Sequence, residues 1–387
     1  MSLIPPMPPG NELKALLQDV PQLNRKLEQD PTLLNSTRLK EMDLSGLVVK
    51  NTTLKNLKWH NIKLVNAVFE DVTIEDSQWV GVRCKDCTLR NVTFSKVTLD
   101  QDRQIKEGGS NFINGVMDDV RFIDSRLLDV MIDELEPSRL TFERVTLKND
   151  DSGEAWQDMG FIHHSVIHVT IKDSTIYYPN MGRLRYPSEI IIENSHIEEG
   201  SLGDRLKRLE ITHSHFEGAG PGYADYVYIA DSKVDIGLPE ARFIHFKNNE
   251  YLENSQASSG IGHVSTAVID GCKNIFDVSF FESHIANLYI RDCTLKDPYF
   301  KNSKIGLIQL CNVTISRNPE DPINGDLNQM AWDKASIRQA QFHNVTFSGP
   351  FPVKGLSIGQ LQASDSRLPD ELTRAARQQG PLDGGCP

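Results

Sequence analysis

Apolar side chains recur at every fifth residue over most of this chain. Twelve consecutive positions at this spacing, from Leu44 to Leu99, hold Leu, Val, Leu, Trp, Leu, Phe, Ile, Trp, Cys, Leu, Phe and Leu. Helix faces recur about every 3.6 residues and strand faces every two, so a sustained period of five requires a corner after every few residues. The pattern predicts a solenoid whose coils turn four corners.

The same period returns after each interruption. Nine apolar residues occupy nine such positions from Ile275 to Ile315, although only 39% of the chain is hydrophobic. Two positions before each central residue a second apolar or small residue recurs, and two positions after it Asn, Asp or Gly recurs, as at Asn56 and Asn61. Asn, Asp and Gly tolerate left-handed backbone. The sequence therefore predicts very short strands separated by two-residue corners.

With these features the chain resembles the pentapeptide-repeat family over about residues 41–368. The segments Asn91-Val92-Thr93-Phe94 and Asn312-Val313-Thr314-Ile315 carry a variant of the family's unit, in which Asn precedes the inward small residue. The resemblance implies an all-β fold, a right-handed quadrilateral β-helix with four pentads per coil. At twenty residues per coil, about twelve coils are expected. The coil is also expected to be wider and less uniform than is usual, as in β-helical regions of some secreted bacterial effectors.

The chain divides into four expected segments. Residues 1–10, with four prolines, are expected to be a flexible leader without a signal peptide. Residues 11–40 have leucines at helical spacing and are predicted to form an N-terminal helical cap. Residues 41–368 are the expected pentapeptide-like β-helix with inserted loops. Residues 369–387 are an expected C-terminal tail that begins with a short helix around Glu371–Arg377.

Breaks in the period predict loops that leave the frame, where a rigid repeat scaffold usually carries its function. Two of these loops combine tryptophan with acids. One contains Asp150, Asp151 and Trp156, and the other contains Trp332. Each is interpreted either as a solvated loop whose tryptophan folds back on the frame or as an anchor for a protein partner. The expected loops are 100–110, 149–159, 178–189, 217–224, 252–264 and 316–334.

Histidines offer one geometric hint of a metal or pH-sensitive site. His196 and His215 each precede an inward residue and are four pentad steps apart, which predicts that they stack on neighbouring coils. Ladders of like residues are common in solenoids, however, and no carboxylate is predictably within reach. Cys84 and Cys87 form a Cys-x-x-Cys pair without a second pair at ligand spacing. We therefore predict no metal and no cofactor.

Composition narrows the function further. The net charge is −12 and no basic patch is evident, so direct nucleic-acid binding is not expected. No apolar stretch is long enough to predict a membrane span. The six cysteines are interpreted mostly as core thiols of a reducing compartment. The expected location is the cytoplasm, or a host cell into which a bacterium delivers the protein.

No Ser-His-Asp spacing, glycine-rich phosphate loop or pair of acids at predictable separation is found, so no catalytic residue is predicted and the chain is not expected to be an enzyme. The leading hypothesis is a non-enzymatic protein–protein interaction scaffold, and specifically a secreted bacterial effector. One alternative is a DNA mimic that inhibits a topoisomerase, as some pentapeptide-repeat proteins do. Another is the substrate-receptor module of a larger enzyme system. The oligomeric state stays open.

Overall fold

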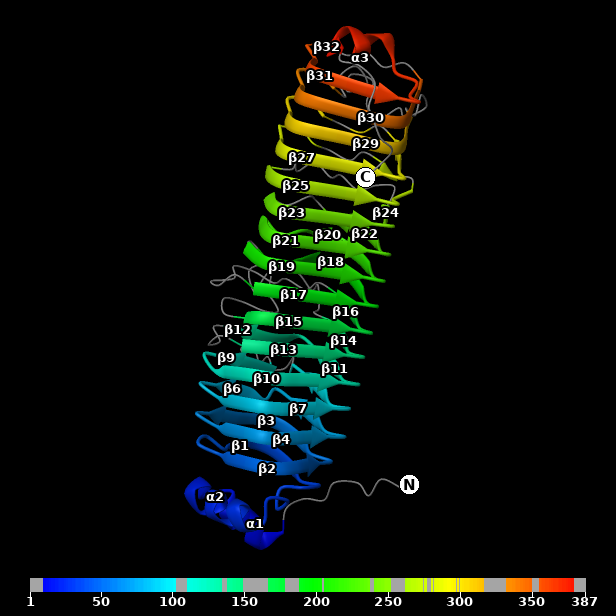
Figure 1. Cartoon of the computed structure of the whole chain (residues 1–387). Helices are drawn as coiled ribbons and strands as arrows, with labels where there is room; N and C mark the ends of the chain where they lie inside the picture. Colours follow the sequence, from blue (N-terminus) through cyan, green and yellow to red (C-terminus); the bar gives the residue numbers. More distant parts are fainter. Residues whose placement is uncertain are drawn as a thin grey trace. The chain divides into compact units, whose positions relative to one another are not determined.

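The computed structural model is built almost entirely of parallel β-strands that stack coil upon coil (Figure 1). The described residues are 10–101, 110–133, 138–148, 166–177, 188–203, 205–236, 240–251, 262–273, 275–276, 280, 282–296, 298, 300–316, 332–349 and 355–378.

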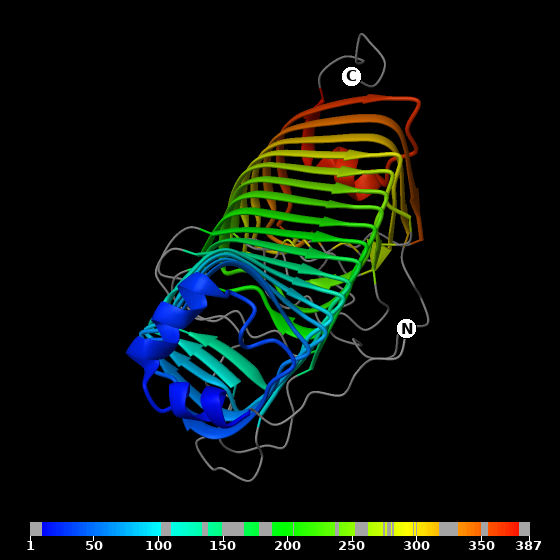
Figure 2. The same cartoon turned by 90° about the horizontal axis from the view of Figure 1, so that it is seen from below.

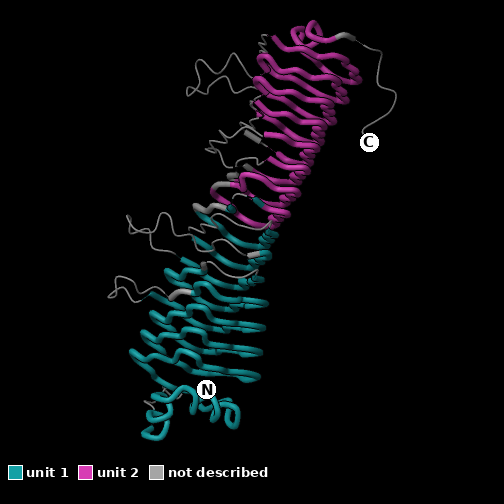
Figure 3. Tube along the Cα trace, turned by 90° about the vertical axis from the view of Figure 1, so that its left-hand side faces the viewer, with its two compact units in different colours: residues 1–205 teal, residues 206–387 magenta. Residues whose placement is uncertain are grey.

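The chain forms two compact units, residues 1–205 and residues 206–387 (Figure 3). Parallel stacked sheets form a β-solenoid of about twelve turns, and a small helical segment precedes the first strand. The predicted all-β solenoid with an N-terminal helical cap is therefore confirmed.

A coil in unit 1 contains twenty residues. Val49 pairs in register with Phe69, and Phe69 pairs with Leu89, so equivalent inward residues lie twenty positions apart. Left-handed backbone recurs every five residues at the corners, with φ between 50° and 57° from Asn51 to Asp76. Four left-handed corners per twenty-residue coil make the coil four-sided, as the five-residue period predicts.

Each coil of unit 1 contributes one strand to a sheet of long strands and shorter strands to a second sheet. We call these the long-strand sheet and the short-strand sheet. The long strands are β2 (Val48–Lys55), β4 (Val68–Glu75), β7 (Thr88–Ser95), β10 (Val116–Ile123), β13 (Ser138–Glu143), β15 (Val166–Lys172) and β17 (Ser188–Glu193). The others are β1 (Arg38–Asp43), β3 (Lys58–Val65), β5 (Gln78–Val80), β6 (Arg83–Lys85), β8 (Thr98–Asp100), β9 (Ser110–Ile113), β11 (Arg126–Leu128), β12 (Val130–Asp133), β14 (Thr146–Lys148), β16 (Thr175–Tyr177) and β18 (His196–Ser201).

Unit 2 also stacks parallel strands. Its long strands are β19 (Arg205–Thr212), β21 (Tyr223–Ala230), β23 (Glu240–Lys247), β25 (His263–Asp270), β27 (His284–Arg291), β29 (Lys304–Ser316), β30 (Ser336–Ser348), β31 (Ser357–Ser364) and β32 (Ala376–Gln378). The others are β20 (His215–Ala219), β22 (Lys233–Ile236), β24 (Glu250–Tyr251), β26 (Ile275–Phe276) and β28 (Thr294–Lys296). Of these, β26 and β28 join the same sheet as the longer strands of unit 2, because β26 pairs with β28 and β28 pairs with β29.

Two helices, α1 (Asn11–Leu16) and α2 (Val20–Gln29), lie across the first coil of unit 1 (Figure 2). The Asn24 side chain joins α2 to that coil: its amide donates to the Gly46 carbonyl at 2.9 Å, and its oxygen accepts from the Val48 N–H at 3.0 Å. Leu23 and Leu27 of α2 are fully or almost fully buried. The two helices therefore contact each other and cover a strand edge of the first coil. Without them this edge would be open to association with another chain.

Aromatic side chains stack from coil to coil in the interior. The Trp59 and Trp79 ring centroids lie 5.2 Å apart with an interplanar angle of 6°, and Phe280 and Phe300 of unit 2 are 4.5 Å apart. A polar ladder accompanies them. The Ser77 hydroxyl accepts from the Leu57 N–H at 3.0 Å and donates to the carbonyl of its own strand's Glu75 at 2.7 Å. Buried hydroxyls are thus satisfied by backbone, as a dry core requires.

Expected segment boundaries differ from the observed ones in three places. Strand pairing begins at Arg38 rather than at residue 41. The expected loop 217–224 is mostly strand, because β20 continues to Ala219 and β21 begins at Tyr223. Helix α3 (Asp370–Arg374) is shorter than expected, and β32 pairs with β31 immediately after it. The expected leader, apart from Gly10, lies outside the described residues.

Candidate functional site: a groove on unit 2

Of the four sequence-predicted partner contacts, Trp332 alone lies within the described residues. Asp150, Asp151 and Trp156 lie outside the described residues. Trp332 is only 1% exposed, and its ring centroid lies 4.3 Å from that of Phe300. This matches the interpretation in which the tryptophan folds back on the frame, and it leaves almost no Trp332 surface for a partner.

The two predicted histidines lie in different units, so their stacking stays a prediction. Each nevertheless has a carboxylate within reach, contrary to expectation. His196 Nε2 is 3.5 Å from Glu198, and His215 Nε2 is 2.7 Å from Glu217. Side chains at i and i+2 point to the same face of a strand, which is why each histidine meets the acid two residues later. The i, i+2 spacing of histidine and glutamate is the sequence signal that predicts both pairs.

The cysteines lie mostly in the core, as predicted. Cys84, Cys87, Cys272 and Cys293 are buried and free. Cys311 is buried but disulfide-bonded, so the interpretation of core cysteines as free thiols is wrong at that position. Among the residues that the structure describes, no group of three or more His, Cys, Asp or Glu side chains is placed to hold a metal ion.

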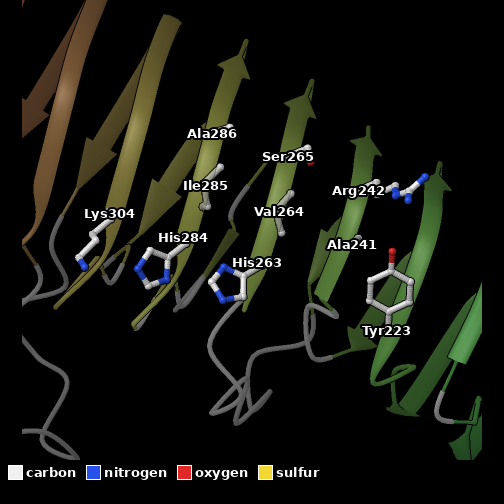
Figure 4. A pocket seen from close by; sticks show the side chains of 10 residues that line it. All are labelled: Tyr223, Ala241, Arg242, His263, Val264, Ser265, His284, Ile285, Ala286 and Lys304. Atoms are coloured by element: carbon white, nitrogen blue, oxygen red, sulfur yellow. The ribbon is translucent and has the colours of Figure 1, made fainter.

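A groove of about 520 Å³ lies on unit 2 at the beginning of strands β21 to β29 (Figure 4). Two rows of outward side chains border it. The first row stands at the strand starts and contains Tyr223, His263, His284 and Lys304. The second row stands at the corner two residues later along each strand and contains Arg242, Ser265 and Ala286. The inward residues between the rows, such as Val264 and Ile285, are buried and form the base.

Strand register aligns the two histidines and the lysine of the first row. His263 pairs with His284, and His284 pairs with Lys304, so the three side chains project from neighbouring strands at the same level. All three are exposed. The two imidazole centroids are 4.8 Å apart with an interplanar angle of 26°. Neither imidazole hydrogen-bonds to, and Lys304 forms no ion pair with, another residue in the described part of the chain.

The end of the groove at β21 and β23 is occupied by a closed polar group. The Tyr223 hydroxyl donates to Asp225 at 2.8 Å, and Arg242 Nε lies 3.4 Å from the same carboxylate. The hydrogen bond to Asp225 raises the pKa of Tyr223 above its usual range, so the phenol remains protonated at neutral pH. This group is internally neutral and leaves Lys304 as a charged side chain of the groove without an ion pair in the described residues.

Aromatic side chains form a ridge beside the groove. Tyr226 of β21 and Phe243 of β23 stack with centroids 5.4 Å apart, and the Arg208 guanidinium lies 5.8 Å from the Tyr226 ring centroid. Burial raises the pKa of the Tyr226 phenol. Because the two rings face each other, they offer their edges rather than an open face to a ligand. The ridge therefore suits apolar contact better than stacking on a sugar or base.

The groove is open because the corner residues are small. In β2, β4, β7 and β10 one corner is made by a left-handed Asn or Asp, at Asn51, Asp71, Asn91 and Asp119. In the long strands of unit 2 no described residue at that corner has positive φ. In β25, β27 and β29 the corner residues next to the inward side chain are Ser265, Ala286 and Gly306. These three residues are not part of the strand pairing.

Gly306 is required by close backbone contact. A Cβ at this position would lie 2.5 Å from the Ala286 carbonyl oxygen, closer than van der Waals contact allows. Gly306 follows Lys304 and the inward Ile305 along β29. The five-residue period does not reveal the groove, because the period marks inward residues, whereas the groove depends on outward residues and on their partners in neighbouring coils.

Two side chains that line the groove, Tyr223 and Ser265, carry hydroxyl groups. Ser265 has no hydrogen-bonded base among the described residues, and the Tyr223 hydroxyl donates to Asp225.

In the described residues no helix is long and apolar enough to cross a membrane. Comparison with protein-family models, curated proteins and solved structures gave no match.

Proposed function

We propose that this protein is a non-enzymatic interaction scaffold that binds a protein partner through the groove and aromatic ridge of unit 2. The observation that carries the proposal is the exposed, unpaired row of His263, His284 and Lys304 beside Tyr226 and Phe243. Tyrosine and arginine are enriched in interface hot spots, and a rigid sheet presents them at a low entropic cost of ordering.

An alternative role as a DNA mimic is less well supported. A DNA mimic needs rows of carboxylates that are free to replace phosphates. In unit 1 the carboxylates of the long-strand sheet are largely neutralised by the next coil, as in Lys50–Glu70 at 2.7 Å, Lys55–Glu75 at 2.8 Å and Arg144–Asp124 at 2.6 Å. This pairing favours a partner that meets the groove of unit 2 over one that reads acidic rows.

We also infer that the solenoid is a divergent member of the pentapeptide-repeat family. The support is the recurrence of left-handed residues at a spacing of five, through Asn56, Asn61, Asn66, Asp71 and Asp76. Unit 2 departs from that pattern at one corner, where small residues replace the left-handed one. Such a departure would weaken the sequence signal of the family while leaving the stacked coils intact.

A site-specific cross-linking experiment tests the scaffold function. A photo-reactive phenylalanine derivative at Tyr223 should form a defined adduct with another protein in cells of the source organism. The same derivative at Thr88, which holds the equivalent strand-start position in unit 1, should not. Lys304→Glu should remove the Tyr223 adduct, and Lys50→Glu should leave it. The proposal fails if Tyr223 yields no protein adduct, or if the adduct persists equally in both charge variants.

A further inference from the structure

We infer that the groove recognises an extended acidic peptide segment, with one carboxylate bound between His263 and His284 and a second bound by Lys304. This inference rests on the proposed function and specifies the chemistry of the partner. Two acids lie close to the row: Asp225, and Glu240, which holds the strand-start position between Tyr223 and His263. Asp225 is engaged by Tyr223 and Arg242, and Glu240 lies over the backbone of Gly262.

The stacked histidines favour an anionic ligand. Two imidazoles with centroids 4.8 Å apart repel each other when both are protonated. A carboxylate that accepts a hydrogen bond from each ring offsets this repulsion and forms charge-assisted bonds with both. Because both rings are exposed at the strand starts, a ligand reaches them without displacing a partner within the described structure.

The spacing of the row matches an extended chain. Neighbouring strands are about 4.8 Å apart, so the midpoint of the two histidines lies about 7 Å from Lys304 along the stacking direction. In an extended peptide, side chains at i and i+2 lie on one face roughly 6.7 Å apart. A Glu-x-Glu segment that runs along the strand-stacking direction therefore places one carboxylate at the histidine pair and the next at Lys304.

The groove also has room for the peptide backbone. Ser265 and Ala286 form the second row that borders the groove, so the side chains on that border are small. At the β21 end, the Tyr226 and Phe243 edges provide an apolar surface for a neighbouring residue of the ligand. The combination of two anion positions and one apolar contact is typical of short linear motifs of protein partners.

A polyanion such as nucleic acid fits less well. Duplex DNA carries a charge about every 1.7 Å, whereas this row offers one lysine and two imidazoles. The chain as a whole has a net charge of −12, which repels a long polyanion. A short segment with two acids gains the local attraction and encounters less of this repulsion.

Binding of labelled peptides to the full-length protein tests the inference. The probe is a fluorescein-labelled acetylated hexapeptide with a central Glu-Tyr-Glu, measured by fluorescence anisotropy at 50 mM NaCl. The matched control peptide has Gln-Tyr-Gln. We expect the Glu peptide to bind at least tenfold tighter than the Gln peptide. Lys304→Glu should weaken binding of the Glu peptide at least tenfold, and His284→Asn should weaken it severalfold. Lys50→Glu, on unit 1, should change it less than twofold.

Several outcomes would overturn the inference. Equal binding of the Glu and Gln peptides would exclude carboxylate recognition, and equal losses in the Lys304 and Lys50 variants would exclude the groove. A single-stranded oligonucleotide that binds tighter than the Glu peptide and displaces it would identify a nucleic-acid site instead. Circular dichroism of each variant verifies folding. If the Tyr223 cross-link forms while the Glu peptide does not bind, only this inference fails. If the peptide binds and no cross-link forms, the proposed partner function fails.

Discussion

The outer surfaces of the long-strand sheets differ between the two units at one position of the coil, the residue that follows the first inward side chain. In unit 1 this position alternates in charge along the register Lys50, Glu70, Arg90 and Asp118. Lys50 pairs with Glu70 at 2.7 Å, and Asp118 pairs with Arg139 of the next coil at 2.8 Å. Except for Arg90, these side chains of unit 1 therefore find an oppositely charged partner on a neighbouring coil within the described residues.

In unit 2 the same position starts as a charge ladder and then stops. Asp225 and Arg242 pair at 3.4 Å, but the following coils place Ser265, Ala286 and Gly306 there. Side chains that already form ion pairs add little binding free energy when a ligand arrives. Lys304 and the two histidines beside this gap can still form hydrogen bonds with an anionic ligand. The proposed binding groove thus lies where a side-chain ladder of the solenoid ends.

The largest expected effect concerns the floor of that gap. Gly306→Ala places a Cβ about 2.5 Å from the Ala286 carbonyl oxygen, so the backbone must shift. Overpacking of this kind costs about 1–3 kcal/mol. Urea denaturation should show a loss of about 2 kcal/mol in the free energy of unfolding. The control Ala286→Gly should cost less than about 1 kcal/mol. Equal stability of Gly306→Ala and the wild type would contradict the close contact.

A charged side chain placed in the gap of the ladder should weaken peptide binding to the groove. Ser265→Glu places a carboxylate next to Arg242 and on the same strand face as His263, as Glu198 lies next to His196. We expect the affinity for the Glu-Tyr-Glu peptide to fall at least tenfold, or about 1.4 kcal/mol. The isosteric Ser265→Gln adds the same bulk without charge and should reduce the affinity much less. Equal losses would indicate that filled volume, not charge, controls binding.

The difference in corner backbone can be tested with two matched asparagines. Asn91 has φ of 50° and donates to Asp71 at 2.7 Å, whereas Asn287, at the equivalent position of β27, has no left-handed backbone. Left-handed conformation costs a residue such as alanine about 1–2 kcal/mol. Asn91→Ala should therefore lower the free energy of unfolding by about 1 kcal/mol, and Asn287→Ala by a few tenths. Asn91→Gly should retain most of the stability, and a loss equal to that of alanine would contradict the backbone explanation.

The sequence predicted the coil because its physical cause is local. Each inward residue and each Asn or Asp corner, such as Asn56, lies within one five-residue unit, so the period reveals both. The groove is not local in this sense. Successive cations of its row are separated by one whole coil, and inserted segments change the coil length from 21 residues between His263 and His284 to 20 between His284 and Lys304. Unless the strand register is known, the sequence predicts neither the alignment of these side chains nor the gap in the charge ladder.

The smallest expected effect concerns the coil-to-coil ion pairs that protect the surface of unit 1. A hydrogen bond from the Ser45 hydroxyl and then the Lys63 ammonium, 2.9 Å away, lower the pKa of Asp43 from 3.8 to about 2. A lowered pKa in the folded state stabilises the fold above the unfolded value near 3.8, and this contribution is lost as the pH falls from about 4 through 2. Because more than half of both side chains is exposed, we expect a few tenths of a kcal/mol.

A comparison with Asp43→Asn isolates this term. At pH 5.5 the variant should be less stable than the wild type by that amount in urea denaturation, and the difference should shrink toward zero as the pH falls to 2, where the wild-type carboxyl is about half protonated. Lys304→Met offers the matched case in unit 2, since Lys304 has no ion pair in the described residues and its removal should leave the pH dependence unchanged. A pH-dependent loss of the same size at Lys304 would mean that unit 2 also neutralises its own surface, and the groove would then have no free cation to offer a partner.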